Sequence, residues 1–549
     1  MKKGVNDLKE KIFYNGKISC MDKNYTVAEA MYVEEGVIRF VGKLSDVENG
    51  AKLGSEKINL KGKRVIPGLI DTHSHFTSAA LSEAGDTVKF VPETVQDILD
   101  YVKSKTQELE HGQWIYLPNI YPTRIKDLRF PYLFELDRVA PDHPVFADGF
   151  YAGAANTLAL KKTGLYESDQ LGVIRDQHGN PTGRVLGMRN EFQKAIPVAQ
   201  YSREQEDKAY EDLNVEYLRC GITSITEAMS SLSGLQGLGR ALSKGKPFVR
   251  TVLTCVMNPD RPDALLEMKR AASEYPEDFI RMIYGKQLID GGILTGTSYM
   301  RKPYKGVEEL FGYDFEDYHG TLSADFDRLL RSLEVCEENS LKFCAHATGN
   351  LSADLFLDVL EAYKTKNGKL SHGHALLHGN FTDQDMLKRI KDLQVALLFQ
   401  PAWHYKDSHA VITFLDSEDF DTFLPYKTIY NSGIMCAAGS DHMIKHDRNK
   451  AQNPFNPFTA IYNMATRINQ KGNALGEQHK VDVEKAVGFY TEKASFKGGG
   501  HENKGQLIAG KKADFACLSE DIFECPKEII PDIRSVMTVL DGEIRLDEC

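Results

Sequence analysis

Two histidines separated by one residue follow a short apolar segment early in the chain. The stretch "VIPGLIDTHSHF" runs from Val65 to Phe76 and includes His73 and His75 near its end. Alternate side chains of a β-strand point to the same face, so both imidazoles can face one site if this segment is a strand. Paired imidazoles are good ligands for zinc and similar divalent cations. Alone, the pair is weak evidence, because two surface histidines would give the same pattern.

Three later segments end in residues of the same kind. "FCAHATGN" places His346 after an apolar run, "HALLHGN" does the same for His378, and "AAGSDHMI" does so for Asp441. Packing in a barrel favours branched aliphatic side chains, so this recurrence indicates a shared metal site. A divalent cation lowers the pKa of a water molecule and polarises a carbonyl group. Asp441 could then take up the water proton and pass it to a leaving nitrogen.

The segments that must position these residues alternate with amphipathic helical patterns. Eight short apolar runs fit a (β/α)8 barrel of the TIM type, an α/β fold whose active site lies at the carboxyl ends of the strands. The runs are residues 65–75, "PVFADGF", "GITSITEA", "MIYGKQLIDGG", "LKFCAHATGN", "HALLHGN", "QVALLFQP" and "IMCAAGSD".

The remaining stretches suggest how the chain divides into domains. We assign residues 66–499 to the barrel, with an insertion at about 80–143, because that stretch is too long for one crossover. Residues 1–65 and 500–549 alternate apolar and polar residues around glycine turns. Together they predict one small β-sandwich domain built from both ends of the chain.

Composition excludes several classes of protein. The chain has 549 residues and a formal net charge of −11, which argues against nucleic acid as a partner. It contains neither an apolar run long enough to span a membrane nor the apolar core of a secretory signal. The nine cysteines include no C-x-x-C pair, which is typical of reduced thiols. We therefore expect a cytoplasmic protein without a membrane partner.

Taken together, these motifs resemble the amidohydrolase superfamily of metal-dependent hydrolases. More narrowly, the chain is similar to the amidohydrolase-3 (YtcJ-like) branch, which includes N-substituted formamide deformylases. The resemblance runs through nearly the whole chain. Its motifs are "VIPGLIDTHSHF", "GKQLIDGGILTGTSYMRKPY", "FCAHATGNLSADLFLDVLE", "LLFQPAWH", "GSDHM", "NPFTAIYNMATR", "FYTEKAS" and "GQLIAGKKADFACL".

The resemblance implies a role for each strand-end residue. His73 and His75 would be the strand-1 metal ligands, and His346 and His378 those of strands 5 and 6. Lys286 stands where many members have a lysine that bridges two metals once it is carbamylated. Asp441 would bind metal weakly and act as the proton shuttle. We expect one or two zinc ions, with manganese or iron as alternatives, and an ordinary barrel lysine remains the alternative for Lys286.

The reaction and the substrate are less sharply defined. Hydrolysis of an amide-like C–N bond is the first choice, and the same site would serve a deaminase, a lactone or ester hydrolase, or a scaffold that has lost activity. Leu377, Phe150 and Asn350 depart from the branch pattern, where glutamate, histidine and aspartate are usual. These changes put the substrate in doubt more than the metal chemistry.

Several further side chains are candidates for the pocket. An oxyanion could be stabilised by His346, His378 or His404 if these are not committed to metal. Glu227 either faces the site or makes a buried structural hydrogen bond. We expect a small molecule with an apolar or aromatic part, such as an N-acyl, N-formyl or cyclic amide, and a homodimer is compatible with the sequence. The expected substrate contacts are Phe150, Tyr151, Tyr304, Phe399 and Trp403.

Overall fold

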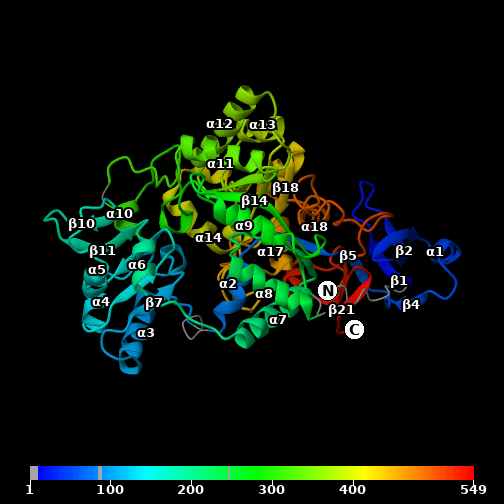
Figure 1. Cartoon of the computed structure of the whole chain (residues 1–549), viewed down its shortest axis with the longest axis horizontal. Coiled ribbons are helices and arrows are strands. Elements are labelled where there is room, and N and C mark those ends of the chain that lie inside the picture. The colour runs from blue at the N-terminus through cyan, green and yellow to red at the C-terminus, as the bar shows by residue number, and fades with distance from the viewer. Residues whose placement is uncertain (1–9, 85–89, 245–247, 314) are drawn as a thin grey trace.

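A barrel occupies the middle of the molecule, between two other sheets (Figure 1). The computed structural model describes residues 10–84, 90–244, 248–313 and 315–549. Residues 1–9 of the expected end domain and 85–89 of the expected insertion lie outside the described residues. In Figure 1 the insertion lies at the left and the strands of both chain ends lie at the right.

The barrel consists of eight strands in the order β18-β17-β16-β15-β14-β13-β12-β6, and every neighbouring pair is parallel. A parallel bridge between Ser74 and His442, and the bond from the Thr72 hydroxyl to Ala438 O, bring the two end strands together. The predicted barrel is therefore confirmed. The strands are β6 (Leu69–Ser74), β12 (Ile222–Glu227), β13 (Arg250–Val256), β14 (Ile280–Leu288), β15 (Lys342–Ala347), β16 (Ala375–His378), β17 (Ala396–Phe399) and β18 (Met435–Ala438).

One of the eight predicted barrel strands was wrong. The run "PVFADGF" contributes strand β8 (Val145–Asp148) to the sheet of the insertion, and the missing barrel strand is β13. Four buried residues make β8 look like a strand covered on both faces, which is the usual pattern inside a barrel. Strand β13, "RTVLTCV", was overlooked because Arg250 and two threonines interrupt its apolar run.

Helices cover the outside of the barrel. Helix α13 shows why they form: Asp383 caps its first turn by accepting from Met386 N, and Met386, Ile390 and Leu393 bury one face. Among the described residues, no helix is long and apolar enough to cross a membrane. The helices are α2 (Phe76–Ser82), α7 (Arg203–Arg219), α8 (Leu232–Ser243), α9 (Asp263–Ala272), α10 (Val307–Phe311), α11 (Phe326–Glu338), α12 (Asn350–Asn367), α13 (Gln384–Leu393), α14 (Pro401–Phe414), α15 (Ser417–Asp421), α16 (Tyr426–Ser432), α17 (Pro457–Thr466) and α18 (Val483–Gly488).

The insertion after β6 and α2 forms a five-stranded sheet with its own helices, in the strand order β10-β11-β9-β8-β7. It extends well beyond the expected limit at residue 143, because its sheet continues to Leu186. Phe146 and Phe192 stack at 3.9 Å between ring centroids in its core. Its elements are α3 (Val95–Glu108), β7 (Ile115–Pro118), η2 (Pro122–Arg124), α4 (Leu133–Val139), β8, β9 (Ala152–Ala155), α5 (Thr157–Lys162), β10 (Val173–Arg175), β11 (Pro181–Leu186) and α6 (Arg189–Ala195).

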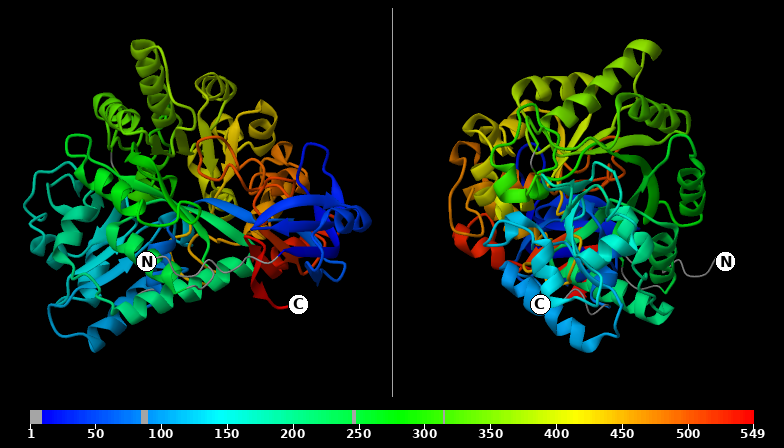
Figure 2. Two further views of the ribbon diagram at one scale, coloured as in Figure 1. Left: turned by 45° about the vertical axis from the view of Figure 1, so that its right-hand side comes forward. Right: turned by 90° about the vertical axis from the view of Figure 1, so that its left-hand side faces the viewer.

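Strands from both chain ends share one sheet, and the blue and red ribbons lie side by side in Figure 2. Hydrogen bonds join these strands into one eight-stranded sheet. Both ends contribute to one core, in which the rings of Phe13 and Phe515 meet edge to face. The elements are β1 (Lys11–Ser19), β2 (Val27–Glu34), β3 (Val37–Gly42), α1 (Leu44–Gly50), β4 (Glu56–Asn59), β5 (Arg64–Pro67), β19 (Phe515–Leu518), β20 (Ser535–Leu540) and β21 (Glu543–Asp547).

Candidate active site

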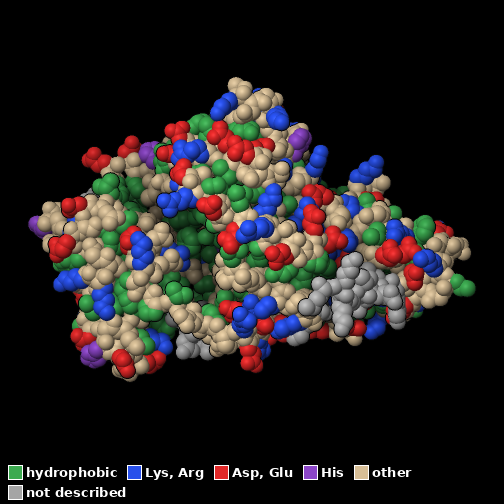
Figure 3. All heavy atoms as spheres, viewed as in Figure 1, with side chains coloured by type: hydrophobic (Ala, Val, Ile, Leu, Met, Phe, Trp, Pro, Cys, Tyr) green, Lys and Arg blue, Asp and Glu red, His purple; other side chains and the backbone are tan. Residues whose placement is uncertain are grey.

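A cavity of about 290 Å³ lies at the carboxyl ends of the barrel strands. The insertion supplies part of its wall, and Figure 3 shows a hollow with hydrophobic side chains between the insertion and the barrel. Polar groups of the barrel that line the cavity include His73, His75, Lys286, His346, His378 and Asp441. Residues of the insertion that line it are Asn119, Tyr121, Gly149, Phe150, Tyr151 and Arg189.

Three of these groups lie close enough together to share one cation. Single ligand atoms of His73, His378 and Asp441 all lie within 4.8 Å of one another, and all three residues are buried. Asp441 Oδ1 lies 3.3 Å from His73 Nε2 and 3.2 Å from His75 Nε2. The carboxylate therefore stands between the two imidazoles of strand β6 and its following turn. One carboxylate among imidazoles is a donor set that suits zinc and related cations.

The hydrogen bonds of His378 fix which ring nitrogen can bind a cation. Its Nδ1 lies 2.6 Å from Gln400 Oε1, and the Gln400 amide is oriented by its Nε2 donating to Leu398 O at 2.9 Å. Nδ1 must therefore carry the proton, which leaves a lone pair on Nε2. That Nε2 is buried, with no hydrogen-bond partner among the described residues. An orphaned buried acceptor beside a carboxylate fits a metal ligand, and a partner on the far nitrogen is usual for such histidines.

Backbone strain is concentrated at the same place. His378 has a φ of +73° and Asp441 a φ of +55°, in the left-handed region that residues other than glycine rarely adopt. Asp441 is held there by its N–H donating to His73 O and by Asn453 Nδ2 donating to Asp441 O, both at 2.7 Å. Strain of this kind tends to mark functional positions.

Burial sets the protonation states of the cluster. It lowers the pKa of His73 and of His346 to about 4, and it lowers the pKa of His378 well below its usual value. Burial alone would raise the pKa of Asp441, but His73, His75 and His378 more than offset it and lower that pKa. Neutral imidazoles beside an ionised carboxylate are the forms that bind metal ions.

Comparison with known proteins assigns the chain to a family. The sequence model of the amidohydrolase family, amidohydrolase-3 type, matches residues 56–545. The chain belongs to the amidohydrolase family. It is 23% identical to an N-substituted formamide deformylase of Arthrobacter pascens over 99% of both chains. It is 25% identical to the putative amidohydrolase YtcJ of Bacillus subtilis (strain 168), over 97% of this chain and 98% of that one.

The fold of this amidohydrolase is also found among solved structures. An uncharacterized metal-dependent hydrolase from Pyrococcus horikoshii superposes with a TM-score of 0.70 at 20% identity, over 94% of this chain and 99% of that one. The family and the site together make the protein a metal-dependent hydrolase acting on C–N bonds.

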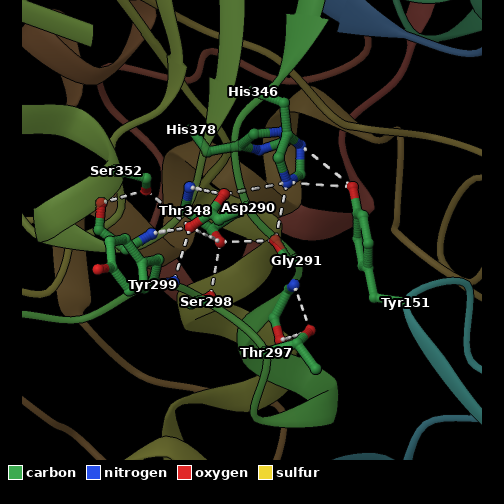
Figure 4. Close-up of polar contacts among 12 residues, drawn as sticks. Tyr151, Asp290, Gly291, Thr297, Ser298, Tyr299, His346, Thr348, Ser352 and His378 are labelled. Atoms are coloured by element: carbon green, nitrogen blue, oxygen red, sulfur yellow. Dashed lines mark hydrogen bonds and ion pairs between the residues drawn. The ribbon is translucent and has the colours of Figure 1, made fainter. Parts of the chain in front are cut away.

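His346 of the amidohydrolase approaches the cluster but is held by a neighbouring loop (Figure 4). Its ring centroid lies 4.2 Å from that of His378. Its Nε2 lies 2.8 Å from Gly291 O, so Nε2 is the nitrogen that donates and Nδ1 retains the lone pair. The Tyr151 hydroxyl, from the insertion, lies 3.0 Å from the same Nε2.

Asp290 fixes the loop that holds His346, and the sequence did not single it out. Its buried carboxylate accepts from the backbone N–H groups of Tyr299, Thr348 and Gly349 and from the hydroxyls of Thr348 and Ser352, at 2.7–3.1 Å (Figure 4). Burial raises the pKa of Asp290 to about 6 in spite of these bonds. The carboxylate joins the segment after β14 to the start of α12 and thereby sets the position of Gly291 O.

Asp71 makes a second brace that sequence reasoning missed. Its carboxylate accepts from Ser440 N at 2.9 Å, from the Ser440 hydroxyl at 2.6 Å and from His73 N at 3.1 Å. It therefore links the first barrel strand to the loop that carries Asp441. The available signal was its position at the start of "DTHSH", two residues before His73. A carboxylate buried there needs several hydrogen-bond donors.

Lys286 lines the cavity from the end of β14. Its Nζ donates to Ala228 O at 3.1 Å, and burial lowers the pKa of this amine.

Glu227, the other candidate left open by the sequence, points toward helix α2. It accepts from Thr77 N at 3.0 Å and from the Thr77 hydroxyl at 3.3 Å, which is the structural alternative stated above.

Three expected site residues do not line this cavity. His404 is buried, with Nε2 3.1 Å from Leu475 O and Nδ1 accepting from Asn463, and it does not line the cavity. Phe399 packs against Tyr426 and Phe489 on the other side of its strand. Tyr304 donates to Ser298 O and packs among aromatic rings. In each case packing against neighbouring side chains turns the residue into the core.

The expected contacts Phe150, Tyr151 and Trp403 do line the cavity, and further lining residues were not foreseen. Arg189 comes from α6 of the insertion, with its Nε 2.7 Å from Asp148 Oδ2 and its guanidinium 4.3 Å from the Phe150 ring centroid. Asn380 follows His378 in "HGN", which was the only signal for it. The position of Arg189 depends on how the insertion docks, which no local pattern reveals.

Proposed function

We propose that this amidohydrolase cleaves an amide-like C–N bond of a small, uncharged molecule that carries an apolar or aromatic group. The observation that carries the proposal is the unpartnered Nε2 of His378, which lies with His73 and Asp441 at one cavity. Similarity to an N-substituted formamide deformylase supports the same bond type. The cavity of about 290 Å³ suits a small molecule rather than a polymer.

Zinc is the cation we propose, held by His73, His378 and Asp441, with His75 and His346 at the edge of the cluster. Buried imidazoles and a single carboxylate favour it over the oxygen-rich sites of magnesium or calcium. The bound cation would supply a Lewis acid that polarises the substrate carbonyl and lowers the pKa of water. Ionised Asp441 then accepts a proton and delivers it to the leaving nitrogen.

Lys286 supports a second cation site. An amine whose pKa is lowered by burial is more often neutral, and a neutral amine can add carbon dioxide to form a carbamate anion and a proton. We propose this carbamate at Lys286. Labelling with carbon-13 bicarbonate should give a carbamate signal that is absent in Lys286→Ala, and the variant should lose one of two metals. A fully loaded wild-type protein without that signal would contradict the proposal.

Apolar side chains at the cavity support the substrate class. Leu288, Ile293, Leu294 and the rings of Phe150 and Trp403 line it, so burying an alkyl or aromatic group supplies binding energy of about 25 cal/mol per Å². Leu377, where the branch usually has glutamate, is buried in an apolar cluster with Ile70 and Tyr284 and does not line the cavity.

A substrate panel tests the proposal directly. Metal-depleted protein should be inactive, and zinc or manganese should restore hydrolysis of N-formyl and N-acetyl derivatives of benzylamine and alkylamines. Lactones, aminated heterocycles and phosphate esters serve as competitors in the same assay. The amidase proposal fails if aminated heterocycles or phosphate esters are turned over best, and the metal requirement fails if metal-free protein is fully active.

A further inference from the structure

Two buried side chains present unpartnered polar atoms at the cavity. Asn380 has no exposed surface and Trp403 is 8% exposed, and both line the cavity. Within the described part of the chain, Asn380 Oδ1, Asn380 Nδ2 and Trp403 Nε1 have no hydrogen-bond partner. Packing alone would be served better by leucine and phenylalanine, because an unsatisfied buried polar atom lowers stability. Three such atoms at one cavity point to a ligand that satisfies them.

These atoms lie beside the cation ligands. Asn380 follows His378 after one glycine, and the Trp403 ring lies 6.2 Å from the His378 ring at an interplanar angle of 72°. The guanidinium carbon of Arg124 lies 5.8 Å from the Trp403 ring centroid and helps to fix that ring. A group bound by Asn380 and Trp403 would therefore be next to the reacting centre.

We propose that Asn380 and Trp403 form a subsite that recognises the N–H and C=O of an uncharged secondary amide, an inference that rests on the proposed function. Asn380 Oδ1 accepts from the substrate N–H, and Trp403 Nε1 donates to the carbonyl oxygen on the opposite edge of the amide, which keeps a second lone pair for the cation. Asn380 Nδ2 is left for a further acceptor on the bound molecule. Both side chains are neutral, so they select an amide over a carboxylate or an ammonium group. Tertiary amides and esters lack the N–H and leave Oδ1 unsatisfied.

Binding to metal-depleted protein separates recognition from catalysis. The probes are N-benzylacetamide and its N-methyl derivative, titrated by calorimetry. Wild-type protein should bind the secondary amide roughly tenfold more tightly, the effect of one buried hydrogen bond. Asn380→Leu should remove this preference. Trp403→Phe should weaken both probes alike and keep the preference, because it loses only the donor to the carbonyl.

Two controls keep the result specific. Met229→Leu alters another lining residue that has no hydrogen-bonding group, so it should affect both probes equally. If Asn380→Leu fails to fold, Asn380→Ala, which also lacks the acceptor oxygen, takes its place. The melting temperature of Asn380→Leu should be unchanged or higher, since an unsatisfied group is replaced by an apolar one. A marked drop would instead indicate a structural role.

The outcomes distinguish this subsite from the proposed function. Equal binding of both probes by wild-type protein, or a preference that survives in Asn380→Leu, overturns the subsite even if metal-loaded enzyme hydrolyses amides. A preference that Asn380→Leu removes, without any amide hydrolysis by metal-loaded protein, supports the subsite and refutes the amidase.

Discussion

At the scale of single residues, the chemistry of the site depends on which nitrogen of each imidazole carries the proton. His378 and His346 use opposite nitrogens as donors: Nδ1 of His378 faces Gln400 Oε1, and Nε2 of His346 faces Gly291 O. The remaining nitrogen of each ring keeps its lone pair. The strand-end histidines could be predicted from the sequence, but these tautomers could not, because they are set by groups from other segments.

Gln400 provides a direct test of this arrangement. Gln400→Leu removes the acceptor that orients His378, so we expect cation affinity to fall roughly 10–100-fold, the usual effect of losing such a partner. Competition with a chromophoric chelator measures this. Gln287→Leu is the matched control, because Gln287 is also buried but its amide faces Met257 O and the Ser332 hydroxyl. Equal affinities of the two variants would show that Gln400 does not orient the ligand.

Asp441 is predicted to move the proton. Asp441→Asn keeps the shape of the side chain but removes the base, so kcat should fall roughly 10²-fold or more in protein saturated with metal. Metal content must be measured in the same samples, because Asp441 also belongs to the ligand cluster. Near-native turnover of the metal-loaded variant would exclude Asp441 as the proton carrier.

At the scale of elements, the sequence predicted seven of the eight barrel strands and missed β13. Strands β15, β16 and β18 were recognised because apolar runs lead into His346, His378 and Asp441. Strand β13 has no such ending and begins with Arg250, whose burial depends on Asp514 and Asp541 far along the chain. Long-range pairing of this kind leaves no local pattern in either segment.

One buried contact between elements predicts acid sensitivity. Glu337 in α11 accepts from His374 Nε2 at 2.9 Å and from Ser371 N at 2.8 Å, and His374 Nδ1 accepts from Phe343 N. Burial alone would raise the pKa of Glu337, but these bonds lower it to about 2. Burial also lowers the pKa of His374 below its usual value of 6.5.

Because both pKa values are lowered in the native protein, the unfolded chain binds these protons more readily than the native one. Acid therefore destabilises the native protein. The contribution of His374 is present above pH 6.5 and is lost as the pH falls below it. That of Glu337 is present above pH 4.5 and is lost between 4.5 and about 2. Glu337→Gln should therefore lower the free energy of unfolding by about 1 kcal/mol at pH 7 and flatten its fall below pH 4.5.

Urea unfolding of metal-depleted protein at several pH values measures the effect. Glu338→Gln is the matched control, because Glu338 is exposed and follows Glu337 in helix α11. Parallel pH profiles for wild type and Glu337→Gln would contradict the assignment.

At the scale of the whole molecule, two arginines tie the outer parts to the barrel at opposite ends of its strands. Arg250 begins β13 and pairs with Asp514 and Asp541, which belong to the C-terminal part of the chain near the end sheet. Arg124 belongs to the insertion. Its Nε and Nη2 donate to Oδ1 and Oδ2 of Asp407 in α14, at 2.8 and 2.7 Å. In barrels of this type the amino-terminal face serves stability and the carboxyl face serves catalysis. Of these two arginines, Arg124 is therefore the one expected to affect the reaction.

Arg124 reaches the active site through a short chain of contacts. Its Nη2 donates to Asn453 Oδ1 at 2.9 Å, and Asn453 Nδ2 donates to Asp441 O at 2.7 Å. Arg124→Lys keeps the charge but loses the two-pronged contact, so Asp441 and the Trp403 ring should be held less firmly. We expect kcat/KM to fall roughly tenfold or more, because small displacements of catalytic groups are costly. Stability should fall by only about 1–2 kcal/mol.

Arg129→Lys separates this effect from general damage to the insertion. Arg129 pairs with Glu135 at 2.8 Å, and both residues lie within the insertion. This control should lose a similar or smaller amount of stability and keep its kcat/KM. The comparison requires both variants to be saturated with metal, so that a change in cation affinity is not read as a change in turnover. If the two variants lose activity in proportion to their lost stability, Arg124 is only a structural clamp and the insertion does not position Asp441.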